Sequence, residues 1–116
     1  MTQEVTAVER VADIVSRARE DSGLDDRQIS LVLGIHPRAL ELWDGEVSSL
    51  SPGLSGRLTA FTRMAYLASQ SIPRDAVAGW WIMPNTRLGG LRPLELVVRN
   101  PGLLYTELAG VGQGLG

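Results

Sequence analysis

The sequence contains no cysteine and a single histidine, and these absences exclude several kinds of chemistry. Without cysteine the chain has no disulfide, no thiolate nucleophile and no cysteine-based metal site. The one histidine, His36, precedes a proline and lacks the partner groups that general-base catalysis needs, so it fits a helix cap or surface role better. No group of His, Asp and Glu has metal-ligand spacing. We therefore expect a binding protein without metal or cofactor rather than an enzyme.

The charge balance and the lack of long apolar runs argue against a general attraction to nucleic acid or to membranes. The 116 residues carry a net charge of −2, so no overall positive field attracts DNA. No apolar run approaches the roughly 18 residues that a membrane span needs, and the first residues are not basic like those of a targeting signal. We expect a cytoplasmic protein that forms one domain, or two small helical units sharing one core.

Apolar residues recur three or four positions apart along most of the chain, and no segment alternates as a strand does. We expect helices over residues 5–21, 28–33, 36–44, 58–70 and 73–81, a loop over 47–56, a short helix after Pro93 and a last helix over 101–109. Residues 110–116 include four glycines, too many for a helix on their own, and are expected to form a flexible tail. The expected fold class is all-α.

Residues 29–43 have the spacing of a helix-turn-helix. Ser30 is small where two helices would cross closely, and Gly34 permits the sharp turn between them. Ile35 would fill the space between the helices, while Leu40 and Trp43 would anchor the second of them inward. The pattern predicts the fold unit but leaves DNA binding open.

The outward positions of the helix after this turn are poorly suited to reading DNA. Besides His36 they are Arg38, Ala39, Glu41 and Leu42. Only Arg38 could contact a phosphate or a guanine, and Glu41 would repel phosphates. Two interpretations stay open: a DNA-reading helix, or a helix-turn-helix kept as scaffold or dimer surface. The acidic composition favours the second.

The most informative stretch of the chain is residues 81–97, which predicts a helix end, a tight turn and a helix start in quick succession. Pro84 would end one helix, because it cannot donate to the helical ladder. Asn85 and the pair Gly89-Gly90 would supply the turn, and Pro93 suits the first turn of the next helix.

The order of these features resembles the Xre/MbcA/ParS family of antitoxins over about residues 24–116. The residues that carry the resemblance and are expected to act structurally are Gly34, Trp43, Trp81, Pro84, Asn85, Leu88, Gly90 and Pro93. The resemblance implies an Xre-like helix-turn-helix, which with a preceding N-terminal helix makes up residues 1–50, packed with a C-terminal helical toxin-binding domain that ends in a flexible tail in residues 54–116. It also implies a partner: a RES-domain toxin, with an ADP-ribosyltransferase-like fold that consumes NAD. Family antitoxins place C-terminal residues into or over the active-site cleft of the toxin.

The candidate toxin-binding residues follow the motif or flank it. They are Arg87, Arg92, Arg99, Asn100, Leu103, Leu104, Tyr105, Leu108, Val111, Gln113, Leu115 and Gly116. The last helix is apolar nearly all round, so part of it should meet a partner. A glycine-rich tail can enter a cleft and become ordered on binding, and arginines can pair with carboxylates. The alternative is that the leucines are ordinary core, the arginines only solubilise and the tail is a frayed end.

The function expected from the sequence is that of a type II antitoxin that sterically blocks its toxin. The alternative is a helix-turn-helix transcription regulator that could repress its own operon, although the acidic third helix weakens that inference. The expected partners are the toxin and a second copy of the chain or a hetero-oligomer with the toxin. Operator DNA is an expected partner under the regulatory alternative. The apolar stripe of valines in residues 5–15 could extend a dimer interface.

Overall fold

The computed structural model describes residues 10–43 and 45–112, and within them it confirms an all-α chain without strands. The helices are α1 (Val11–Ser22), α2 (Asp26–Leu33), α3 (Pro37–Glu41), α4 (Pro52–Ser71), α5 (Arg74–Ile82), α6 (Pro93–Arg99) and α7 (Pro101–Gly112), with 3-10 turns at η1 (Val47–Ser49) and η2 (Thr86–Leu88). None of the helices in this described part combines the length and the hydropathy that crossing a bilayer requires.

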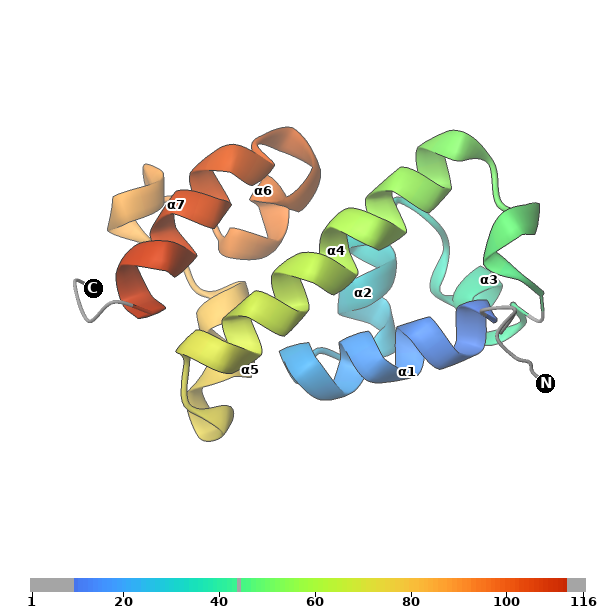
Figure 1. Cartoon of the computed structure of the whole chain (residues 1–116), viewed down its shortest axis with the longest axis horizontal. Coiled ribbons are helices and arrows are strands. Elements are labelled where there is room, and N and C mark those ends of the chain that lie inside the picture. Colours follow the sequence, from blue (N-terminus) through green and yellow to red (C-terminus); the bar gives the residue numbers. More distant parts are fainter. Residues whose placement is uncertain (1–9, 44, 113–116) are drawn as a thin grey trace, which may run out of the picture.

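The longest helix, α4, forms the axis around which the other helices pack. Figure 1 shows α4 running diagonally through the molecule, with α1, α2 and α3 on one side and α5, α6 and α7 on the other. It contacts α1, α2, α5, α6 and α7. Its buried residues are Leu58, Phe61, Met64, Ala65 and Ala68, the inward face that the helical spacing predicts. A single core cluster therefore includes residues from the helices before α4 and from the helices after it.

Helix boundaries follow the capping chemistry of the sequence. Asp25 and Gln28 form a capping box at the start of α2, in which each side chain accepts a hydrogen bond from the other's backbone N–H. Gly34 ends α2 with a left-handed φ of 74°. The Nδ1 atom of His36 accepts a hydrogen bond from the backbone N–H of Arg38 at 3.0 Å, which gives the histidine the capping role expected for it.

Three expected boundaries are wrong. Residues 52–56 of the loop expected over 47–56 are the start of α4, because Ser51 caps the helix and Pro52 occupies its first turn. The third helix ends at Glu41, so Trp43 packs against the core from outside a helix. The last helix continues through Gly110 to Gly112. The part of the first expected helix that precedes Arg10 lies outside the described residues.

The glycines at helix ends allow a matched test of backbone strain. Gly23 and Gly89 both have left-handed φ values, of 73° and 72°, but a Cβ on Gly23 would lie 3.0 Å from the Cβ of Ala78, whereas a Cβ on Gly89 meets open space. We expect Gly89→Ala to lower the free energy of unfolding by about 1 kcal/mol, the cost of the left-handed conformation alone. Gly23→Ala should lower the free energy of unfolding by clearly more than this. Chemical denaturation of both variants measures the two losses. Equal losses would contradict the steric argument.

Candidate partner-binding surface

The stretch from α5 to α6 folds into a closed turn built by the motif residues. Asn85 makes four hydrogen bonds with backbone groups of the turn. Its Oδ1 accepts from Arg87 N–H at 2.9 Å, its carbonyl accepts from Leu88 N–H and Gly90 N–H at 2.9 Å each, and its own N–H donates to the Leu91 carbonyl at 3.0 Å. Gly90 reaches this position with a φ of 84°. The turn therefore fixes the orientation of α6 relative to α5.

Buried side chains on both sides of this turn tie it to the core. Trp81, at the end of α5, has no exposed surface, and Leu88 in η2 is also buried. The Trp81 ring meets Phe61 of α4 edge to face at 5.7 Å and Trp80 at 5.1 Å. Pro84, Gly89 and Gly90 are exposed, and Pro93 is buried at the start of α6. The motif thus holds α6 and α7 against α4.

Arg92 and Glu95 close the first turn of α6. The Glu95 carboxylate accepts hydrogen bonds from the Arg92 backbone N–H at 2.9 Å and from Arg92 Nε at 3.2 Å. These bonds, with the positive charges of Arg92 and Arg99, lower the pKa of Glu95 below its usual value. The ionised carboxylate therefore stabilises the start of α6.

A pH prediction follows from this lowered pKa. Because the pKa of Glu95 is lower in the folded chain than in the unfolded one, its stabilising contribution is present above the unfolded pKa and disappears as the pH falls through the folded value. We expect Glu95→Gln to reduce the melting temperature at neutral pH and to leave it unchanged in strong acid, where the wild-type carboxyl is protonated too. A melting-temperature difference that does not change with pH would contradict this role for the charge.

Helix α7 divides its apolar residues between the core and the surface. Leu104 and Leu108 are buried, so they belong to the core and support the helix from beneath. Leu103 and Tyr105 are 38% and 40% exposed. Asn100 caps the helix, because its Oδ1 accepts a hydrogen bond from Leu103 N–H at 3.2 Å. The side chain of Val111 and the residues Gln113, Leu115 and Gly116 lie outside the described part of the structure.

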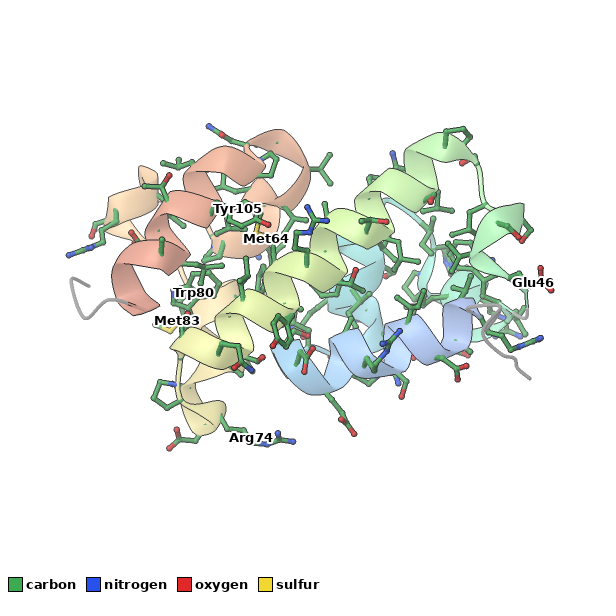
Figure 2. All side chains as sticks on the ribbon, in the orientation of Figure 1. Glu46, Met64, Arg74, Trp80, Met83 and Tyr105 are labelled. Atoms are coloured by element: carbon green, nitrogen blue, oxygen red, sulfur yellow. The ribbon has the colours of Figure 1, made fainter. Side chains whose placement is uncertain are left out.

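A groove of about 480 Å³ runs between α4 and α7, next to the exposed face of α7. Figure 2 shows Tyr105 beside Met64 at this junction, and both side chains line the groove. The other lining residues are Gly56, Thr59, Ala60, Arg63, Pro101 and Gly102. Leu103, two positions before Tyr105, lies on the other flank of the helix and does not line the groove. We call the exposed residues Leu103 and Tyr105 on the two flanks of α7, together with this groove, the α7 surface. It offers apolar contact area around one cation, Arg63.

Sequence reasoning missed the α4 side of this surface. Gly56, Thr59, Ala60 and Arg63 recur at the three- and four-residue spacing of one helix face, so the signal was available. The Ser, Pro and Gly residues of 47–56 hide this signal, because they predict a loop and so place Gly56 outside any helix.

The candidate arginines take different positions. Arg87 lies 3.8 Å from the Glu107 carboxylate and Arg92 pairs with Glu95, so both take part in contacts within the chain. Arg99, at the end of α6, is exposed. Of these three candidate arginines, Arg99 alone forms no ion pair with a carboxylate among the described residues.

Helix α3 lies at the opposite end of the molecule from α7, and α2 lies between them (Figure 1). The side chains of Arg38, Ala39, Glu41 and Leu42 are all exposed there, as a surface helix requires. Helix α3 spans five residues. Among residues 10–43 and 45–112, no group of three or more His, Cys, Asp or Glu could hold a metal ion.

Comparison with known proteins identifies a shared fold. No family model matches the chain, and no curated protein sequence matches it. Among solved structures, the chain is similar to a chain of the crystal structure of the M. tuberculosis MbcT-MbcA toxin-antitoxin complex. The superposition has a TM-score of 0.75 at 23% sequence identity and covers 91% of this chain and 96% of that chain. The two chains therefore share one all-α fold over nearly their whole lengths.

Proposed function

We propose that this protein is the antitoxin of a type II toxin–antitoxin pair and that it binds its toxin through the α7 surface. The observation that carries the proposal is the fold shared with a chain of a toxin-antitoxin complex over 91% of the residues. The resemblance of residues 24–116 to the Xre/MbcA/ParS family also supports it, because that resemblance rests on motif residues and on their order in the sequence.

The α7 surface suits a protein partner. Leu103 and Tyr105 offer apolar and aromatic area that is only partly covered by the chain itself, and such residues contribute strongly when a partner buries them. Exposed Arg63, which lines the groove, can form a charge-assisted pair with a carboxylate of the partner. Binding would then inhibit the toxin sterically, and this inhibition needs no catalytic group, metal or cofactor.

The finer form of the proposal names the partner as a RES-type toxin that consumes NAD in the cytoplasm. Antitoxin binding would block access of NAD to the active-site cleft. The glycine-rich end of the chain, outside the described residues, is the proposed segment that enters the cleft, because a chain rich in glycine can adapt to a narrow space.

Co-expression with the product of the adjacent gene tests this proposal. We expect a stable complex in a tag pull-down, with growth and cellular NAD restored when the antitoxin is present. A toxic partner that forms no complex and is not neutralised would refute the antitoxin function. Neutralisation without any change in NAD would refute only the RES assignment.

A second candidate function is transcriptional regulation through the α2–turn–α3 unit. It is favoured by one observation: the two helices are joined by a short turn at Gly34, and Arg38 is exposed on the second of them. Specific retention of the upstream DNA of its own operon at moderate salt would support it. Equal retention of unrelated DNA would contradict this second function.

A further inference from the structure

A second groove lies between α2 and α6, two helices that contact each other directly. It has a volume of about 530 Å³ and is separate in its lining residues from the groove between α4 and α7. Arg57 of α4 and Arg92 and Arg99 of α6 line it together with a single carboxylate, Glu95. A chain with a net charge of −2 thus concentrates positive charge in one groove.

The arginines of this groove are positioned by local contacts. The Nε atom of Arg57 donates to the backbone carbonyl of Leu33 at 2.8 Å, where α2 ends. Arg92 is held by its pair with Glu95. Arg99 is exposed at the end of α6, close enough to Glu95 to lower the pKa of that carboxyl electrostatically. The cations are therefore partly preorganised before any partner binds.

Two exposed apolar side chains also line this groove. Leu31 of α2 is 65% exposed and Val98 of α6 is 49% exposed. Each is among the most exposed large apolar side chains of the described residues. Apolar area combined with arginines is typical of the contact surface for a protein.

The same composition argues against two other occupants. DNA would place phosphates beside Glu95 and would leave Leu31 and Val98 against a charged backbone. A second copy related by a two-fold axis on this groove would bring identical arginines toward each other, because such an interface pairs the same patch with itself. A different protein that carries carboxylates avoids both conflicts.

We propose that the α2–α6 groove binds an acidic segment of the toxin, with carboxylates on Arg57 and Arg99 and an apolar side chain between Leu31 and Val98. This inference rests on the proposed antitoxin function and adds a second contact surface to the α7 surface. Because α6 lines the groove and contacts α7, one partner can cover both surfaces without a change in the antitoxin fold.

Binding measurements with one charge-reversed variant and one polar variant test the inference. The probe is the purified adjacent-gene product, titrated at low and high salt against the wild-type chain, Arg99→Glu and Leu31→Ser. Loss of one charge-assisted contact should weaken the complex by at least about tenfold at low salt, and the difference should shrink at high salt. Leu31→Ser should weaken binding at both salt concentrations. Circular dichroism confirms that each variant is folded.

Arg74→Glu is the matched control, because Arg74 is exposed on α5 and points away from the body of the molecule in Figure 2. Its affinity should stay within about twofold of wild type, since isolated surface charges contribute little. A wild-type chain that does not bind the probe overturns the antitoxin function and this inference together. If the wild-type chain binds the probe and Arg99→Glu binds it with unchanged affinity, only the proposed role of the α2–α6 groove is overturned. The same conclusion follows if Arg99→Glu loses DNA retention but binds the probe as the wild type does.

Discussion

Replacing Trp81 by alanine will lower the free energy of unfolding by about 3–5 kcal/mol, the range for deleting a large buried aromatic side chain. The Trp81 side chain is fully buried at the end of α5 and contacts Phe61 and Trp80 edge to face. Its removal leaves a cavity where α5 meets α4. Small domains have only about 5–15 kcal/mol of stability in total, so the variant should be partly unfolded at 37 °C.

Urea denaturation followed by circular dichroism measures this effect without relying on tryptophan fluorescence. Trp80→Ala is the control, because Trp80 is only partly buried and should cost less. Trp81→Phe is the informative intermediate. The Nε1 atom of Trp81 has no hydrogen-bond partner among the described residues, so phenylalanine removes an unsatisfied N–H while it keeps most of the ring packing. A Phe variant as unstable as the Ala variant would contradict the packing argument.

Combining Leu103→Glu with Tyr105→Glu should weaken the toxin complex by at least about 100-fold, the scale reached when central contact residues are lost. Both side chains are partly exposed on α7, so the substitutions put charges into the proposed contact and leave the core in place. Affinity by biolayer interferometry and neutralisation of toxicity in cells would measure the effect. Neutralisation should fail while the melting temperature changes little.

Leu42→Glu controls for the introduction of a charge at an exposed leucine. Leu42 follows α3, at the opposite end of the molecule from α7, and it is more exposed than Leu103. We expect its affinity for the toxin to match that of the wild type. If the double variant on α7 neutralises as well as Leu42→Glu does, α7 is not the contact surface.

Most of the fold could be predicted from the sequence where a residue has one dominant local preference. Asp25 before a helical pattern, Gly34 after one, and Pro84 within one each favour a single boundary. The inward face of α4 also followed from spacing alone. Prediction was wrong where the preferences conflict: Ser51 and Pro52 suit both a loop and a helix start, and packing of the following turn against the fold decides between them.

The candidate surface was less predictable than the fold for a related reason. Helix α7 is apolar nearly all round, so its sequence does not distinguish buried Leu104 from exposed Leu103. That distinction depends on where α4 and α6 lie, which is tertiary information. The groove between α2 and α6 combines residues from three helices far apart in sequence, and no local pattern brings Leu31, Arg57 and Arg99 together.

The central position of α4 has a consequence for recombining such proteins. One helix supplies packing faces to α1 and α2 on one side and to α6 and α7 on the other. A chimaera joined in the loop before Pro52 would combine the α4 of one parent with the α1 and α2 of another. Exchanging the proposed partner specificity between relatives would therefore mean transferring the outward residues of α2, α4, α6 and α7 that line the two surfaces, with the buried α4 contacts retained. The unit that can be transplanted is a surface and not a segment.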